Sequence, residues 1–189
     1  NSWRLFVTQK APDVSVVMPV HNGVPFLSDS ISSILNQTYQ DFEFIIIDDG
    51  STDQTQQVLS RFKKLSSSIS VVTNQSNLGI AYSLNKGLAQ ARGRFIARMD
   101  SDDIAIRNRL QKQIQKFLQD DNLVICGSNA LIVDDQLKPL RATMLPLSDW
   151  DIRSTCAFEN PFAHPTVMMR RDIVLSVGGY DTEFETTQD

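Results

Sequence analysis

Cysteine and histidine are both scarce in this sequence, which has two of each among 189 residues. Cys126 and Cys156 are too few for a disulfide framework and lack the spacing of a metal site, so we expect two buried, reduced thiols in a reducing, cytosolic setting. His21 and His164 have no partner at metal-ligand spacing, so we expect ordinary packing or hydrogen bonding for each. These absences exclude a disulfide scaffold and argue against a zinc centre.

Basic charge is in deficit as well, since 18 lysines and arginines face 22 acidic residues and the net charge is −4. No basic stripe is present that could neutralise the phosphates of a nucleic acid. No apolar run approaches the roughly 18 residues that a membrane-spanning helix needs, and the opening residues lack the long apolar core of a signal peptide. We therefore expect no nucleic-acid partner and no membrane span in this chain.

Glycine and proline are also few, with eight and seven residues, and there is no low-complexity tract or repeat of fixed period. This composition argues against disorder and against repeat architectures. The chain is 41% hydrophobic and long enough to bury one sizeable core, so we expect one domain or most of one. It begins at Asn1 and stops without a polar tail, which favours a piece cut from a longer protein.

The first half of the sequence alternates β-branched apolar runs with segments of helical period. The runs predict strands over residues 14–20, 42–48, 69–73, 94–99 and 123–127. The apolar stripes between them predict helices that begin near Pro25 or cover residues 58–65, 81–91 and 110–118. Repeated strand and crossover-helix units build a mainly parallel sheet flanked by helices, so the sequence predicts an α/β fold.

The rhythm changes after Ser128. The expected elements there are a hairpin over 129–141, a short capped helix within 146–158, a strand over 166–170 and a helix over 171–179. We place Leu65 and Leu118 on the inward stripes of their helices, and Trp3 and Trp150 in the core or at its edge. No flexible linker separates the two parts, so the second half should continue the same globule.

Polar clusters follow three of the predicted strands at the point where each strand ends. They consist of His21 and Asn22 after the first strand; Asp48, Asp49, Gly50, Ser51 and Asp53 after the second; and Asp100, Ser101, Asp102 and Asp103 after the fourth. The carboxyl ends of parallel strands meet at one edge of a sheet, where such folds bind their ligands. All three clusters could therefore line one cleft.

The acidic cluster behind the fourth strand allows two interpretations. Asp100 and Asp102 are two positions apart, so in extended backbone their side chains project to the same side and can face one cation. Hard oxygen ligands favour Mg²⁺ or Mn²⁺, which complete their coordination with phosphate oxygens and water, so a phosphorylated ligand is implied. Alternatively, Asp102 or Asp103 caps a helix that begins near Ile106.

The cluster behind the second strand also has a structural explanation. Ser51 to Asp53 are good caps for the following helix, and Gly50 suits a turn. Capping explains Asp48 and Asp49 less well, because adjacent acids at the end of an apolar strand point in different directions. We expect one of the two to stay in the fold and the other to meet a ligand.

Together these segments closely resemble family-2 glycosyltransferases, which are inverting enzymes with the A-type nucleotide-sugar fold. The likeness rests on residues 14–55, 77–103, 164–171 and 178–184, and it spans roughly Pro12 to Asp189. It implies a single A-type domain with a Rossmann-like N-terminal half. Residues 1–12 would be an N-terminal extension or leader, 13–127 the nucleotide-sugar-binding half, and 128–189 the truncated start of the acceptor-side half.

The resemblance also implies roles for residues that bind the nucleotide. Asp49 would hydrogen-bond the base, usually uracil, and Pro19 and Val20 with the loop to Asn22 would border it. The loop with Asn77 and Gly79 would lie beside the nucleoside. Many relatives carry arginine where this chain has Leu84, so one contact common in the family is not expected here.

The acidic cluster gains roles in the same way. Asp102 would be the main ligand of Mn²⁺ or Mg²⁺, with Asp100 beside it and nearer the ribose. Asp103 would support the site and cap the next helix. Relatives place a general base in a Glu-Asp pair after the segment 178–181; here that pair is Gln188 and Asp189, so Asp189 is the candidate base.

The implied activity is transfer of a sugar from a nucleotide diphosphate sugar, expected to be UDP-linked, to an acceptor hydroxyl with inversion. Its setting would be the synthesis of polysaccharide, lipopolysaccharide or another glycan. Expected partners are the donor, a glycan or lipid-linked acceptor and a second copy in a homodimer, at the inner face of a membrane reached through other parts of the protein. The alternative is a metal-dependent nucleotide-binding or phosphoacceptor module without glycosyl transfer.

Overall fold

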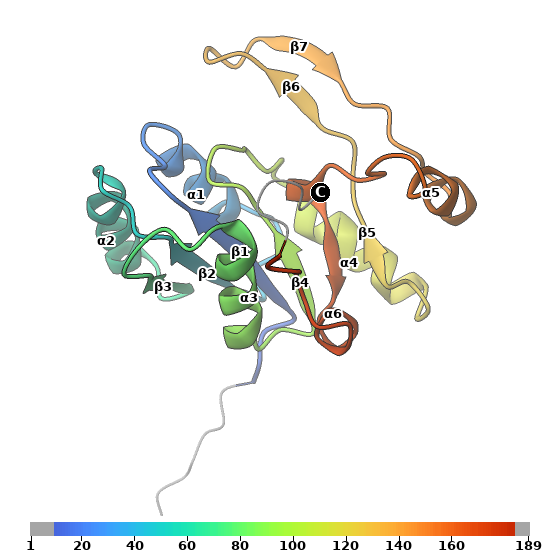
Figure 1. The fold of residues 1–189 in the computed structure, drawn as a ribbon, viewed down its shortest axis with the longest axis horizontal. Coiled ribbons are helices and arrows are strands. Elements are labelled where there is room, and N and C mark those ends of the chain that lie inside the picture. Colours follow the sequence, from blue (N-terminus) through green and yellow to red (C-terminus); the bar gives the residue numbers. More distant parts are fainter. Residues whose placement is uncertain (1–9, 184–189) are drawn as a thin grey trace, which may run out of the picture.

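The computed structural model describes residues 10–183, which form a six-stranded sheet, a separate two-stranded sheet and surrounding helices (Figure 1). The six-stranded sheet has the order β3-β2-β1-β4-β8-β5. Its strands are β1 (Val14–Val20), β2 (Phe42–Asp48), β3 (Ile69–Thr73), β4 (Phe95–Arg98), β5 (Ile125–Cys126) and β8 (Met168–Arg170). The first four run parallel, and β8 is antiparallel to β4 and β5. The predicted α/β fold with a mostly parallel sheet is confirmed.

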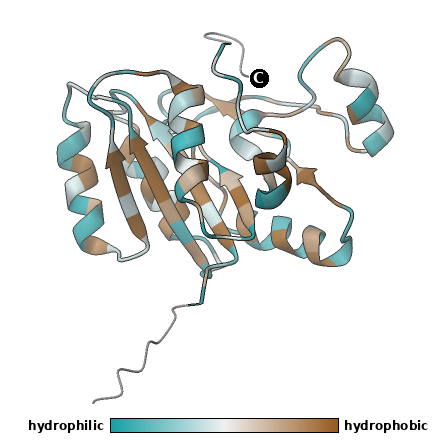
Figure 2. Cartoon of the chain, turned by 60° about the horizontal axis from the view of Figure 1, so that its bottom comes forward, coloured by the Kyte–Doolittle hydropathy of each residue, from teal (hydrophilic) through white to brown (hydrophobic). Residues whose placement is uncertain are grey.

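Helices cover both faces of this sheet. The helical elements are α1 (Leu27–Leu35), α2 (Thr55–Leu65), α3 (Ile80–Gln90), α4 (Arg109–Gln119), α5 (Asp149–Thr155), α6 (Arg171–Ser176) and the 3₁₀ turn η1 (His164–Thr166), of which α5 packs on neither face. Helices α1, α2 and α4 share one apolar cluster with Val16 and Phe44, whereas α3 packs with Val17 and Ile45 on the opposite face. Figure 2 shows the result, with hydrophobic strands inside and the hydrophilic sides of the helices outward.

Sequence periodicity places most elements well. The predicted strands over 14–20, 42–48 and 69–73 match β1, β2 and β3 residue for residue. The strand predicted over 123–127 is reduced to the two residues of β5, which pairs only with β8 at the edge of the sheet. An edge strand lacks a second neighbour that would extend its ladder, and nothing in the sequence marks it as an edge.

Pro19 lies within β1, a central strand, although proline cannot donate a ladder hydrogen bond. Val17 accepts a hydrogen bond from the Met99 amide after β4, and alternate residues of a strand face the same neighbour, so Pro19 also faces that side. The pairing of β1 with β4 ends at Val17 and Arg98, so Pro19 lies beyond the paired residues and interrupts no ladder hydrogen bond. The strand order of the sheet reverses between these same two strands.

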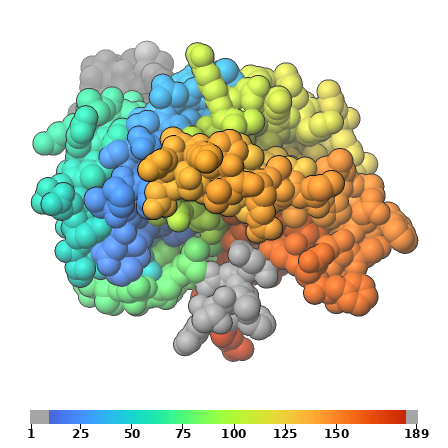
Figure 3. Space-filling model, turned by 90° about the horizontal axis from the view of Figure 1, so that it is seen from above, coloured from blue at the N-terminus to red at the C-terminus, as the bar shows by residue number. Residues whose placement is uncertain are grey.

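The segment after β5 is the least packed part of the fold. The predicted hairpin forms from β6 (Leu131–Val133) and β7 (Pro139–Ala142), and Figure 1 shows it standing off the main sheet. The predicted capped helix is α5, where the Ser148 hydroxyl accepts a hydrogen bond from the Asp151 amide. Viewed from above, the hairpin lies across one side of the molecule (Figure 3).

Several predictions of burial are wrong. Leu65 and Leu118, placed on inward stripes, are exposed, and each lies in the last turn of its helix. Trp150 is 74% exposed on α5, which packs on no core cluster. Cys156 is exposed for the same reason, and Cys126 is only partly buried because it lies in an edge strand. Trp3 lies outside the described residues.

Within residues 10–183, no helix is both long and apolar enough to cross a membrane. This agrees with the hydropathy of the sequence, in which apolar runs stop after a few residues. The longest helices contain 11 residues each, about half the length that a bilayer requires.

Candidate functional site

The polar clusters predicted from the sequence meet at the carboxyl edge of the parallel strands. The loops that follow β1, β2 and β4 all leave the sheet there, because these strands run parallel and in close register. The strand order reverses between β1 and β4, since β2 and β3 lie on one side of β1 and β4 on the other. This reversal point is where open α/β sheets bind ligands.

Asp49 is the centre of a buried polar network. It is only 4% exposed, and its Oδ1 accepts hydrogen bonds from Asn74 Nδ2 at 2.7 Å and from the Leu78 amide at 3.0 Å. Its Oδ2 accepts a hydrogen bond from the Gly79 amide at 2.9 Å. Asn74 in turn bonds Ser83 and accepts from Lys86, both on α3. Asp49 therefore fixes the loop before α3 against the end of β2.

Asp48, the neighbouring acid, points to the opposite face of the sheet. Alternation along β2 places it with Phe44 and Ile46, in the cluster of α1 and α2, and it is fully buried. Its Oδ1 accepts a hydrogen bond from the Ser51 amide, whereas its Oδ2 has no hydrogen-bond partner among the described residues. The two acids do point in different directions, and both are buried.

Asn22 joins the loop after β1 to the loop after β2. Its Oδ1 accepts a hydrogen bond from the Thr52 amide at 2.9 Å, and its own amide donates to Ser51 Oγ at 2.9 Å. Its φ of +53° is left-handed, a conformation that asparagine tolerates better than most residues. Pro19 and Val20, predicted to border a base, are buried in β1 just before this loop.

His21 completes the same corner. Its Nδ1 lies 2.8 Å from the Asp49 carbonyl oxygen and its Nε2 lies 3.2 Å from Asn22 Nδ2. These contacts suit a neutral ring that donates through Nδ1 and accepts through Nε2. The expectation of ordinary hydrogen bonding for His21 is confirmed.

Gly50 must be glycine for two independent reasons. Its φ is +68°, and a Cβ at this position would lie 2.5 Å from the backbone carbon of Ser76. We expect Gly50→Ala to lower the free energy of unfolding by about 2–4 kcal/mol, from left-handed strain and from displacement of backbone. Gly23→Ala is a matched control, because its Cβ would meet only side chains of Val20 and Leu27. Equal urea midpoints for the two variants would contradict this prediction.

Asn77 and Gly79 form the loop that Asp49 holds. Gly79 has a φ of +91°, and its amide donates to Asp49 and to Asn77 Oδ1. A Cβ on Gly79 would meet nothing within 4 Å, so the loop is open to solvent at this point. Leu84, at the position where many relatives carry arginine, is buried in the apolar cluster of α3.

Asp100 lies at the end of β4 and is tied on two sides. Its Oδ2 forms an ion pair with Arg98 Nη1, and its carbonyl oxygen accepts a hydrogen bond from Ser30 Oγ of α1 at 2.8 Å. Arg98 and Arg109 are both buried beneath this point, and burial lowers the pKa of Arg109 to about 10. The sequence analysis missed this pair of cations, although an arginine inside the apolar run of β4 was a visible signal.

Asp102 is exposed and Asp103 is partly buried in the loop that continues from Asp100. Burial raises the pKa of Asp103, and repulsion from Asp100 and Asp102 raises it further. The three carboxyl groups therefore lie close enough to repel one another. Such a cluster favours a cation.

The prediction that Asp102 or Asp103 caps the following helix is wrong. Helix α4 begins at Arg109, its N-cap is Asn108, and no side chain caps it. The intervening loop is held instead by α1 and the turn that follows it, because Ser33 Oγ of α1 accepts a hydrogen bond from the Ala105 amide and the Gln37 side chain donates to the Ile106 carbonyl. After β2, Asp53 Oδ1 accepts a hydrogen bond from the Thr55 amide, but the N-cap of α2 is Gln54 and no side chain caps the helix.

The carboxylates of this loop suit a Mg²⁺-like or Mn²⁺-like ion. Within the described part of the chain, no three His, Cys, Asp or Glu side chains are arranged to enclose a metal. Two carboxylates, Asp100 and Asp102, follow β4 as an exposed edge, and ions of this class need only one or two carboxylates when phosphate supplies other ligands. The donor set fits an ion that arrives with a phosphorylated ligand.

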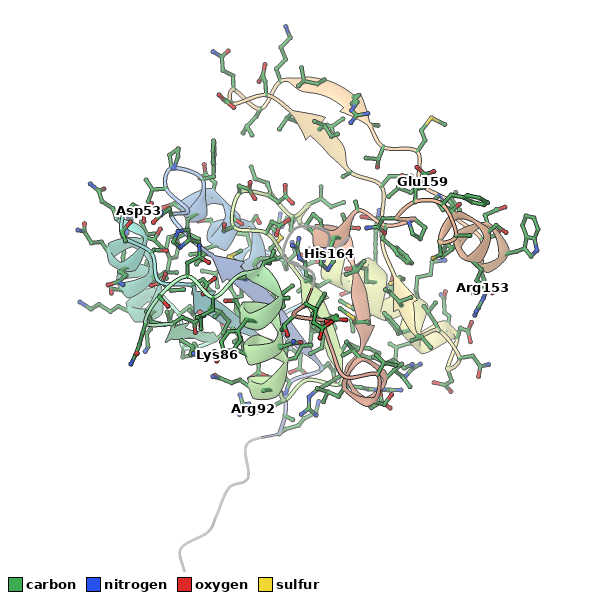
Figure 4. The ribbon with its side chains drawn as sticks, viewed as in Figure 1. Asp53, Lys86, Arg92, Arg153, Glu159 and His164 are labelled. Atoms are coloured by element: carbon green, nitrogen blue, oxygen red, sulfur yellow. The ribbon has the colours of Figure 1, made fainter. Side chains whose placement is uncertain are left out.

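The second half of the chain places His164 beside the same edge. His164 Nε2 lies 3.2 Å from the Tyr180 hydroxyl, and the two rings are 5.5 Å apart. Figure 4 labels His164 near the middle of the molecule, with Lys86 on α3. His164 and Tyr180 line a cavity of about 190 Å³ together with Asn160, Phe162 and Gly179. Asp189, the candidate base, lies outside the described residues.

Comparison with known proteins identifies the family. The model of "Glycosyl transferase family 2" matches residues 15–178. The O-antigen biosynthesis glycosyltransferase WbnJ of Escherichia coli is 34% identical over 168 residues, which cover 88% of this chain and 65% of WbnJ. The E. coli UDP-Glc:alpha-D-GlcNAc-diphosphoundecaprenol beta-1,3-glucosyltransferase WfgD is 40% identical over 127 residues, covering 66% of this chain and 48% of WfgD.

Solved structures show the same fold. The mannosyltransferase PcManGT of Pyrobaculum calidifontis, in complex with GDP-Man and Mn²⁺, has a TM-score of 0.70 at 22% identity and covers 92% of this chain and 49% of its own. S. aureus TarS 1-349 in complex with UDP has a TM-score of 0.71 at 19% identity, and the match covers 93% of this chain and 52% of the TarS chain. The A-type fold expected from the resemblance is thus confirmed.

The chain spans about half to two thirds of the length of the curated relatives that it matches. The match to the family model nevertheless runs from β1 to the end of α6 and includes every loop at the carboxyl edge. The chain therefore belongs to glycosyl transferase family 2.

Proposed function

We propose that this protein transfers a sugar from a nucleotide diphosphate sugar to an acceptor hydroxyl, with inversion at the anomeric carbon. One observation carries the proposal: the Asp49 network after β2 and the acidic loop after β4 lie at the same carboxyl edge of the sheet, on the two sides of β1. Asp49 fixes the loop with Asn77 and Gly79, which would lie beside the nucleoside. The acidic loop would face the diphosphate.

Asp102 and Asp100 are the residues that would hold Mn²⁺ or Mg²⁺. A bound cation of this kind neutralises charge that grows on the departing diphosphate. Asp102 is the better direct ligand because it is exposed, whereas one oxygen of Asp100 is taken by Arg98. The neighbouring structure of PcManGT contains Mn²⁺, which supports the choice of metal.

Asp189 is the proposed general base. It would remove the proton from an acceptor hydroxyl as that oxygen attacks the anomeric carbon and the bond to the diphosphate breaks. Direct displacement in one step inverts the anomeric centre. The partner of Asp189 in the Glu-Asp pair of relatives is Gln188 here, which leaves Asp189 as the acid of the pair.

The donor is proposed to be UDP-linked and the acceptor a glycan or lipid-linked sugar of cell-envelope polysaccharide synthesis. WfgD is named for UDP-Glc and a diphosphoundecaprenol-linked acceptor, and WbnJ for O-antigen biosynthesis. GDP-Man in the PcManGT complex shows that a neighbour of this fold accepts another base. A lipid-linked acceptor would bring the protein to the inner face of a membrane.

A panel of nucleotide sugars tests the proposal. Thermal-shift measurements use UDP-, dTDP- and GDP-sugars, each with and without Mn²⁺. Nucleotide sugars of one base type should raise the melting temperature, and Mn²⁺ should increase their affinity for the protein about tenfold or more. If small phosphoryl donors stabilised the protein and left an acyl phosphate on one of its carboxylates, the phosphoacceptor alternative would be favoured. Absence of any shift in the whole protein would contradict the nucleotide assignment.

A further inference from the structure

One side-chain amide joins the two halves of the chain. Asn85 on α3 donates a hydrogen bond from Nδ2 to the Tyr180 carbonyl oxygen at 2.7 Å. The Tyr180 amide donates back to Asn85 Oδ1 at 2.8 Å. Both backbone groups of Tyr180 are therefore satisfied by one partly buried side chain that lies 95 positions earlier.

The chain reaches Tyr180 through two glycines in left-handed backbone. Gly178 has a φ of +92° and Gly179 a φ of +76°, and both donate to carbonyls of α6 as the helix ends. The two differ in their surroundings. A Cβ on Gly179 would lie 2.5 Å from Asn85 Oδ1, whereas a Cβ on Gly178 would meet nothing within 4 Å. The approach to Asn85 is thus closest at Gly179.

Asn85 lies on α3, the helix that follows the loop with Asn77 and Gly79. Helix α3 begins directly after Gly79, whose amide bonds Asp49, and six residues of helix span about 9 Å. On the other side, Tyr180 contacts His164 and lines the cavity of about 190 Å³ beside β8. The Asn85 amide is therefore a short rigid link between the loop proposed to bind the nucleotide and the wall of that cavity.

We propose that Asn85 is a positioning residue that fixes the segment 178–183 against α3. This inference rests on the proposed function for its catalytic meaning, because the segment precedes the proposed base Asp189 in the sequence and would belong to the acceptor side. Asn85 touches neither donor nor acceptor in this scheme. It sets the distance between the two sides by holding the backbone of Tyr180.

Two substitutions of Asn85 separate positioning from general loss of structure. Asn85→Ala removes both hydrogen bonds, and Asn85→Asp keeps an acceptor for the Tyr180 amide but turns a second oxygen toward the Tyr180 carbonyl. In the whole protein, Asn85→Ala should speed hydrogen exchange of the Tyr180 amide at least tenfold and lower kcat for transfer about 10- to 100-fold. The Kd for the donor nucleotide should stay within twofold. Gln90→Ala, an exposed position on α3, should change none of these quantities.

The glycine pair gives a second, independent test. Gly178→Ala measures the effect of left-handed backbone alone, and Gly179→Ala adds the clash with Asn85 Oδ1. In denaturant titrations, the unfolding equilibrium constant should rise more for Gly179→Ala than for Gly178→Ala, by at least fivefold. Combining Gly179→Ala with Asn85→Ala should remove most of that difference, because the clashing oxygen is gone. Additive effects would overturn the proposed contact.

The outcomes distinguish failure of this inference from failure of the proposed function. Hydrogen exchange and the glycine cycle need no transferred sugar, so they decide whether Asn85 holds the segment even if no glycosyl transfer is found. If the Tyr180 amide exchanged hydrogen at the same rate in Asn85→Ala, the inference would be overturned. The proposed function would still stand if the unaltered protein transferred sugar. Equal loss of nucleotide affinity and kcat would show a role in overall folding and would also overturn it.

Discussion

Replacing Asp102 with asparagine should slow sugar transfer by about 10²- to 10³-fold, because one charge-stabilising contact in an active site typically has this effect. Asp102 is exposed at the edge of the acidic loop, while Asp100 is already paired with Arg98, so Asp102 offers the carboxylate that is free to bind a cation. The same substitution should abolish the gain in nucleotide affinity that Mn²⁺ gives. Calorimetric titration of the nucleotide with and without Mn²⁺ measures this gain directly.

The asparagine variant should keep the stability of the unaltered protein. Asp102 caps no helix, since α4 begins at Arg109, and its removal relieves repulsion with Asp103. Asp121→Asn is the matched control, because that carboxylate is 94% exposed and lies beyond α4. A variant at Asp102 that still responds to Mn²⁺ as the unaltered protein does would refute the assignment of the main metal ligand.

Asp49→Asn should destabilise the protein by about 3–4 kcal/mol and abolish measurable nucleotide binding. Both oxygens of Asp49 accept hydrogen bonds from N–H donors. In the asparagine variant an NH₂ group would replace one of these oxygens and would face an N–H donor, so that buried donor would have no acceptor. The loop with Gly79 would then lose its hold on the end of β2. Denaturant titration and nucleotide calorimetry on the same samples measure the two effects.

Asp48→Asn is the control for this prediction, since it removes a neighbouring buried acid with different contacts. Only one of its oxygens accepts a hydrogen bond among the described residues, and its side chain lies in the cluster with α1 and α2. We expect nucleotide affinity in this variant to stay within about threefold of the unaltered protein, a difference of less than 1 kcal/mol. Similar losses in both variants would mean that Asp49 has no special part in the site.

The metal loop shows where local patterns mislead. Asp102 and Asp103 stand before an apolar helical stripe, which is a common signature of a cap, yet the helix starts only at Arg109. Hydrogen bonds with Ser33 of α1 and with Gln37 just after it, more than 65 positions earlier, hold the intervening loop in place. A cap signature depends only on residues that are close in the sequence. Here, hydrogen bonds from residues distant in the sequence satisfy backbone groups of the loop instead.

The amino-acid sequence by itself determined the α/β class, the bounds of the first three strands and the positions of the polar clusters. Each of these follows from short-range periodicity or from the parallel direction that crossover helices impose. The family resemblance likewise came from motifs in their order along the chain, and the match over residues 15–178 confirms it.

Tertiary structure alone decided how those residues are used. It buried Asp49 among donors from the loop before α3, paired Asp100 with Arg98, and brought Asn85 to the backbone of Tyr180. It also left Trp150 and Cys156 exposed, because α5 packs on no core cluster. Such pairings depend on which segments distant in the sequence become neighbours, and no local pattern of residue types specifies that choice.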